Sequence, residues 1–306
     1  MHQLVNGSHF GEVAGYFEWW YFHFASASGF AANIVLHETD IFGLRKSPYV
    51  SMSYQLPHRE PQYLRMAIPD ESITRSSEYL SQLEGLFAES DSNIEIRLSF
   101  PSGETFEVAI TKLAEPLILN NCVLYHEGDK RSYWRLQVPF GRFNGILKAE
   151  SGNFPIEGVV YHDHQWGNIS IQDFVSDWVW GHFSSNESSA VFFAIQTKKG
   201  DLIERYAVVS PSSVQSSIVH GQVPHLEKLV NSGNPELWSG EPVVTFPFGA
   251  TLRTRINPNA LLRSRVNEAH GGFVATYLRW AGDAIVSPLN SFHYGITEYI
   301  RIRKED

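Results

Sequence analysis

The sequence contains a single cysteine, Cys122, and this scarcity limits the chemistry that the chain can use. One thiol cannot form an internal disulfide, and nothing flanks it with metal-ligand spacing. A buried cysteine commonly acts as a small apolar residue, and we expect that role for Cys122. The sequence therefore predicts no disulfide framework and no catalytic thiol.

Long apolar runs and runs of basic residues are also missing. The longest clean apolar runs, such as residues 190–195, have the length of a strand, whereas a membrane-spanning helix needs about 20 apolar residues. The formal net charge is −9 at pH 7, and a nucleic-acid-binding protein would be expected to carry a basic stripe. We therefore expect neither a membrane-spanning helix nor a nucleic-acid partner.

Several common catalytic motifs are absent. There is no Gly-x-Ser-x-Gly elbow, no phosphate-binding loop and no dinucleotide-binding glycine pattern. No motif requires a cofactor, so we predict none. Residues 1–8 have neither the basic nor the apolar region of a secretory leader. Together with the lone cysteine, this predicts a cytoplasmic protein.

Aromatic residues are abundant instead. Phe, Trp and Tyr make up 13% of the 306 residues, and eight of them are Trp. Their large, flat and polarisable faces suit either a packed core or a pocket for an unsaturated ligand.

Alternating patterns predict many short strands. Residues 93–100 place apolar side chains on even positions, residues 101–104 form a turn, and residues 106–110 resume the alternation. This pattern is typical of a half-buried β-hairpin. Similar strand patterns recur along the chain at 18–24, 31–37, 134–138, 145–149, 156–161, 178–183, 190–197, 203–209, 243–248, 251–256, 273–280 and 296–303.

Helical patterns are scarce. Residues 70–87 are the best candidate helix, residues 259–268 are a weaker one, and residues 210–240 read as a long loop. The length exceeds what one ordinary core needs, although one large sandwich would also fit. We predict an all-β fold of two antiparallel β-barrel domains, residues 1–167 and 168–306.

The first candidate site segment is Glu18 to Phe24. On a strand, Glu18 shares a face with Trp20, whereas Tyr21 points to the other face. A carboxyl group beside large aromatic rings is desolvated, which raises its pKa and allows it to act as an acid. The alternative is that Glu18 lies in water at the end of the strand.

The second segment, residues 161–167, is the densest in functional groups. On a strand, His162 and His164 point the same way and Asp163 points the opposite way. These groups suit proton transfer. They also suit a structural polar network, or a metal site completed by His37 or His182.

The third segment, residues 177–183, places Trp178, Trp180 and His182 on one face of a strand. Two indole faces can stabilise a developing carbocation by cation–π attraction. A packed aromatic core with a hydrogen-bonded histidine explains the same pattern.

Taken together, residues 18–22, 161–167 and 178–182 resemble the hydroxyneurosporene synthase family. That family includes carotenoid 1,2-hydratases and AttH-like proteins, and fungal lipocalin-like Diels–Alderases are similar in architecture. The three segments keep the family's order and spacing, the resemblance covers most of the chain, and the middle segment is the most specific. The resemblance implies two lipocalin-like barrels and an apolar, unsaturated substrate.

The family's His-x-Trp pattern matches His164 and Trp166. The resemblance implies that His164 carries a proton or orients water, and that Trp166 faces a cation. The hydratases are expected to have an acidic residue downstream of the third segment, but residues 190–197 contain none. Asp163 and Glu18 are therefore the candidate acids.

These observations predict a cofactor-independent cyclase or hydratase. Its substrate would be hydrophobic and polyene-like, such as an isoprenoid, a carotenoid-like molecule or a linear polyketide, and transient membrane contact during uptake is left open. The alternatives are a Diels–Alderase-type pericyclic cyclase, with Tyr21 or Gln165 as hydrogen-bond donor, and a non-catalytic carrier. The expected catalytic residues are His164, Asp163 and Glu18. The expected substrate-binding residues are Trp166, Trp178, Trp180, His182, Trp20, Tyr21 and His162.

Overall fold

The chain divides into two compact units. A computed structural model describes residues 6–9, 15–39, 48–69, 73–74, 82–83, 87–220, 243–245, 251–269, 272–287 and 290–304. The first unit comprises residues 1–57 and 63–170, and the second comprises residues 58–62 and 171–306. Each unit is built on its own antiparallel sheet.

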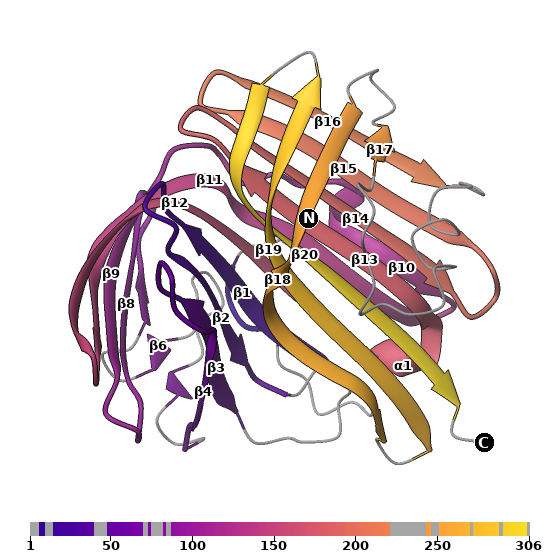
Figure 1. Cartoon of the computed structure of the whole chain (residues 1–306). Coiled ribbons are helices and arrows are strands. Elements are labelled where there is room, and N and C mark those ends of the chain that lie inside the picture. The colour runs from indigo at the N-terminus through magenta and orange to yellow at the C-terminus, as the bar shows by residue number, and fades with distance from the viewer. Residues whose placement is uncertain are drawn as a thin grey trace. The chain divides into compact units, whose positions relative to one another are not determined.

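The sheet of the first unit has ten strands, drawn from indigo to magenta in Figure 1. Their order is β4-β3-β2-β1-β12-β11-β9-β8-β7, and β10 pairs with β11. The strands are β1 (Phe17–Ala25), β2 (Ala31–His37), β3 (Tyr49–Gln55), β4 (Gln62–Ala67), β7 (Phe87–Glu89), β8 (Asn93–Ser99), β9 (Thr105–Lys112), β10 (Val123–Glu127), β11 (Lys130–Ala149) and β12 (Gly152–Gly167).

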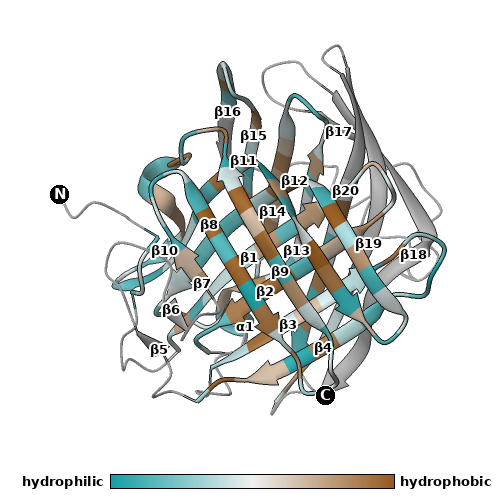
Figure 2. Cartoon of the chain, turned by 90° about the vertical axis from the view of Figure 1, so that its left-hand side faces the viewer, coloured by the Kyte–Doolittle hydropathy of each residue, from teal (hydrophilic) through white to brown (hydrophobic). Residues whose placement is uncertain are grey.

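The predicted hairpin is confirmed as β8 and β9. Its alternating sequence places the residues of β8 alternately in the core and in solvent, and Figure 2 shows brown and teal bands along both strands. The apolar face of the hairpin joins a core that also includes Leu64 of β4 and Phe87 of β7. Since β4 and β7 stand at opposite ends of the strand order, the sheet must curve into a half-barrel around this core.

The second unit repeats this connectivity in an eight-stranded sheet. Its order is β16-β15-β14-β13-β20-β19-β18-β17, so its first strand also pairs with its last. The strands are β13 (Val175–Ser184), β14 (Ser189–Thr197), β15 (Leu202–Ser210), β16 (Ser213–His220), β17 (Val243–Thr245), β18 (Thr251–Ala269), β19 (Phe273–Ser287) and β20 (Asn290–Lys304).

The all-β prediction is confirmed, with short additional elements. These are the helix α1 (Ile171–Phe174), the 3-10 helix η2 (Asn120–Cys122) and a two-stranded sheet of β5 (Ile73–Thr74) and β6 (Gln82–Leu83). Cys122 is buried and free, as expected. In the described residues, no helix has the length and apolar character to cross a lipid bilayer.

Both predicted helices are corrected where the structure describes them. Residues 259–268 lie inside the strand β18, whose pairing with β19 overrides their helix-like spacing. In the predicted helix 70–87, residues 73–74, 82–83 and 87 are in strands, and the others lie outside the described residues. The predicted loop 210–240 contains the strand β16, and its remainder from residue 221 lies outside the described residues.

Candidate active site

The pairing of β1 with β12 assembles the candidate site in the first unit. Directly opposed residues of two antiparallel strands share a face of the sheet. The register brings together side chains of the first two candidate segments on the core face, as the pairs Glu18–Trp166, Trp20–His164 and Phe22–His162.

Glu18 lies at the centre of a buried hydrogen-bond cluster. Its side chain is 0% exposed, so the alternative of a solvated strand end is wrong. Oε1 accepts the backbone N–H of His9 at 2.8 Å, and Oε2 accepts the hydroxyl groups of Ser8 at 3.2 Å and of Tyr16. Oε1 also lies 2.8 Å from Nε2 of His164.

Burial shifts the titration of Glu18 towards neutral pH. Desolvation raises the pKa of its carboxyl group from 4.5 to about 7, while the hydrogen bonds from Tyr16 and from the N–H of His9 act in the opposite direction. Loss of hydration disfavours the charged form. Near pH 7 a large share of Glu18 therefore carries a proton, as a general acid requires.

His164 is held in its neutral form next to this acid. Burial lowers its pKa well below 6.5, the positive charge of Arg135 adds to the effect, and the charge of Glu89 opposes it. Nδ1 of His164 is buried and makes no hydrogen bond within the described part of the chain. A neutral imidazole can accept a proton on one nitrogen and release one from the other.

Aromatic rings surround the imidazole of His164. The ring of Trp20 stacks on it at a centroid distance of 4.6 Å, and the ring of Trp166 lies 4.7 Å away. His9 and Tyr133 stack on Trp166 at 4.2 and 5.1 Å. The indole faces beside His164 are suited to stabilising positive charge.

His162 belongs to a second network on the same face. Its Nδ1 lies 3.0 Å from the carbonyl oxygen of Tyr21, which can only accept, so Nδ1 carries the proton. Nε2 then accepts from Nδ2 of Asn6 at 3.0 Å. Burial lowers the pKa of His162 to about 3, so this ring is neutral and links Tyr21 to Asn6, and its role in binding substrate stays a prediction.

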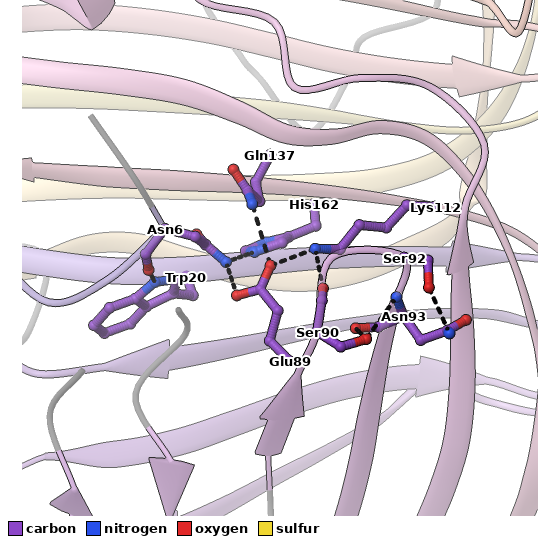
Figure 3. A network of polar contacts seen from close by, with 9 residues as sticks. All are labelled: Asn6, Trp20, Glu89, Ser90, Ser92, Asn93, Lys112, Gln137 and His162. Atoms are coloured by element: carbon purple, nitrogen blue, oxygen red, sulfur yellow. Dashed lines mark hydrogen bonds and ion pairs between the residues drawn. The ribbon is translucent and has the colours of Figure 1, made fainter. Parts of the chain in front are cut away.

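Glu89 is the hub of this network (Figure 3). Its carboxylate accepts from Nδ2 of Asn6 at 2.7 Å, from Nζ of Lys112 at 2.7 Å and from Nε2 of Gln137 at 3.1 Å. The indole of Trp20 donates to the backbone carbonyl of Asn6 at 2.9 Å. The network thus connects four strands, β7, β9, β11 and β12, and the segment 6–9 to the ring that stacks on His164.

Asp163 is separated from Glu18 and His164. It opposes Tyr21 across the β1–β12 pair, on the face opposite to Glu18. Its Oδ2 accepts the hydroxyl of Tyr161 at 2.8 Å. The structure therefore brings together two of the three predicted catalytic residues, and a catalytic role for Asp163 stays a prediction.

Trp178, Trp180 and His182 lie in the second unit, buried on one face of β13. The indole N–H of Trp178 donates to Oε1 of Glu298 at 3.2 Å. Nε2 of His182 lies 3.1 Å from the hydroxyl of Ser184. This segment therefore forms its own hydrogen-bonded aromatic core, and its role in binding substrate stays a prediction.

The metal-site interpretation gains no support from the described residues. No group of three or more His, Cys, Asp or Glu side chains among them is arranged to hold a metal ion. His37 pairs with Trp19, which lies on the face of β1 opposite to Glu18, so it cannot complete a site with His162 and His164.

Several residues of the site were missed in the sequence. Tyr16 stands two positions before Glu18, so the strand alternation contained a usable signal for it. The others gave no such signal, because they lie in a segment without periodicity or reach the site only through the pairing of distant strands. They are Asn6, Ser8, His9, Glu89, Lys112, Arg135 and Gln137.

The raised pKa of Glu18 predicts a pH-dependent difference in stability between wild type and Glu18→Gln. The folded state holds the Glu18 proton more tightly than the unfolded state, so wild-type stability relative to the variant falls as pH rises from 4.5 through about 7. A pKa difference of one unit corresponds to about 1.4 kcal/mol, so the unfolding free energy of wild type relative to the variant falls by about 3 kcal/mol over the whole titration.

Urea denaturation of both proteins at pH 5 and pH 8 measures this difference. His162 and His164 have lowered pKa values and act in the opposite direction in both proteins, so the comparison isolates Glu18. An equal difference in unfolding free energy at the two pH values would show that Glu18 titrates as an ordinary carboxyl group.

Comparison with solved structures shows the fold. A protein described as an AttH from Nitrosomonas europaea matches at 13% identity and a TM-score of 0.62, over 96% of this chain and 94% of its own. The structure of CghA with Sch210972 matches at 9% identity and a TM-score of 0.69, over 98% of this chain and 96% of its own. Kievitone hydratase from Nectria haematococca matches at 10% identity and a TM-score of 0.58, over 97% of this chain and 95% of its own. No family model and no curated protein sequence matches the chain.

These similarities extend over nearly the whole chain and confirm the lipocalin-like, all-β architecture that the family resemblance implies. At identities of 13% or less they establish the fold alone. The chemistry must be argued from the site.

Proposed function

We propose that this protein is a hydratase or cyclase that protonates a carbon–carbon double bond of a hydrophobic, polyene-like substrate. The observation that carries the proposal is the buried contact of 2.8 Å between Oε1 of Glu18 and Nε2 of His164. An acid that titrates near neutral pH and a neutral imidazole together form a proton relay. A structural core does not require this combination.

In the proposed mechanism, protonated Glu18 donates to Nε2 of His164 while Nδ1–H of the same ring is transferred to an alkene carbon. The π electrons form the new C–H bond and leave a carbocation, which the faces of Trp20 and Trp166 stabilise. In hydration, water adds to the cation and releases a proton. In cyclisation, a second double bond attacks the cation and a proton is then lost from carbon. The released proton restores the acid.

The name of one structural neighbour, kievitone hydratase, agrees with a hydration reaction. A second neighbour, CghA, was solved with the small molecule Sch210972. Both span nearly the whole of this chain. Because one fold can support several activities, they support the proposal only together with the Glu18–His164 pair.

Incubation of the protein with a panel of polyenes in D₂O, followed by mass spectrometry, tests the proposal. Proton transfer to carbon is expected to leave one non-exchangeable deuterium in the hydrated or cyclised product. A pericyclic cyclase would give an isomer without deuterium, and a carrier would return the polyene unchanged. Either of these two results would contradict the proposed acid chemistry.

A further inference from the structure

Arg135 is a buried cation directly beside the proposed relay. It lies on β11 opposite His164, on the same face of the sheet. The residue is 7% exposed. Its Nε and Nη1 groups are buried and make no hydrogen bond within the described part of the chain. A guanidinium group donates in a planar fork that fits two oxygen atoms of a carboxylate.

Other buried polar atoms near Arg135 also lack partners among the described residues. On the same face, these are Nδ1 of His164, Oε1 of Gln137 and Oδ1 of Asn6. Buried polar groups are normally hydrogen-bonded, so a group of them without partners requires an explanation. A bound polar group would supply the missing partners.

The charges on this face favour an anion. Lys112 is neutralised by Glu89 at 2.7 Å, His162 and His164 are neutral, and Glu18 is neutral when it holds its proton. Arg135 is then the one cation among these groups without a full counter-charge. Burial lowers its pKa, and the negative charge of Glu89 only partly opposes this shift. An anion against the guanidinium group would offset part of the cost of burying this charge.

We propose that Arg135 binds an anionic oxygen head group of the substrate, a carboxylate or an enolate of comparable acidity, and thereby places the reacting double bond beside His164. This inference rests on the proposed function for the polyene tail of the ligand. It adds a substrate class: polyenes that end in an acidic oxygen group, rather than neutral hydrocarbons or alcohols. Such an anchor would fix the position of the alkene relative to Nδ1 of His164, which is how oriented binding lowers a barrier.

The test compares two probes with the same polyene tail, retinoate and retinol, by isothermal titration calorimetry with wild-type protein. Because hydrogen bonds to a charged group in a buried site are strong, we expect retinoate to bind at least about tenfold more tightly than retinol, which is equivalent to about 1.4 kcal/mol. Arg135→Met should remove this preference. Arg135→Lys, which keeps the charge and loses the planar fork, should retain part of it.

Arg142→Met is the matched control, because it removes the same charge from an exposed position of the same strand; it should keep the preference for retinoate. Equal affinities for the two probes in wild type, or a preference that survives Arg135→Met, would overturn the anchor and leave the proposed acid chemistry standing. Binding of neither probe would contradict the polyene site itself and the anchor with it. Circular dichroism of each variant confirms that it is folded.

Discussion

Glu18→Gln is expected to lower turnover by about 10²- to 10⁴-fold, the usual contribution of a general acid. Glutamine keeps the size and the hydrogen-bonding oxygen of the side chain, but it has no proton to transfer. His164→Phe is expected to cause a loss of similar size. The double variant should be little worse than either single variant, because two groups of one relay act as a unit. Initial rates on the polyene that gives product in wild type measure all three.

Two further variants show whether such a loss is specific. Glu95→Gln changes an exposed glutamate that pairs with Arg97 on the surface, and we expect it to leave turnover unchanged. Asp163→Asn tests the acid that the sequence also suggested on the opposite face of β12. If Asp163→Asn abolishes turnover and Glu18→Gln does not, the assignment of the acid to Glu18 is wrong.

Glu89→Ala is expected to lower the free energy of unfolding by about 3–5 kcal/mol, because it leaves a buried cation without its partner. The side chains of Glu89 and Lys112 are 0% and 8% exposed, and their atoms meet at 2.7 Å. The substitution also removes the acceptor of Asn6 and Gln137. Urea denaturation followed by Trp fluorescence measures the loss.

Glu95→Ala provides the matched comparison. Its ion pair with Arg97 has the same length of 2.7 Å, but the side chains are 53% and 64% exposed. Exposed pairs typically contribute about 0–1 kcal/mol, so we expect little change. Similar losses for the two substitutions would show that the buried network has no special role in stability.

The sequence predicted the parts of this fold that depend on local alternation. The hairpin of β8 and β9 is one example, because every second residue is apolar from 94 to 100 and again from 106 to 110, and the turn between them is short. The pattern failed for residues 259–268, which we predicted as the weaker of two helices. There the pairing of β18 with β19, for example of Leu261 with Trp280, decides the structure.

The same distinction applies to the site. Alternation correctly placed Glu18 with Trp20, and it separated Asp163 from His162 and His164. It did not show that β1 pairs with β12, which is the contact that joins Glu18 to His164. Nor did it point to Glu89, whose role depends on the order of distant strands in the sheet.

The protonation state of Glu18 decides whether this residue can act as the acid. The infrared difference between wild type and Glu18→Gln, recorded from pH 4 to pH 9, isolates the carbonyl band of the protonated Glu18 carboxyl group. We expect this band to be present at pH 5 and to disappear with a midpoint near the pKa of about 7. A band that has already disappeared above pH 5, as for an ordinary glutamate, would contradict the assignment of Glu18 as the acid.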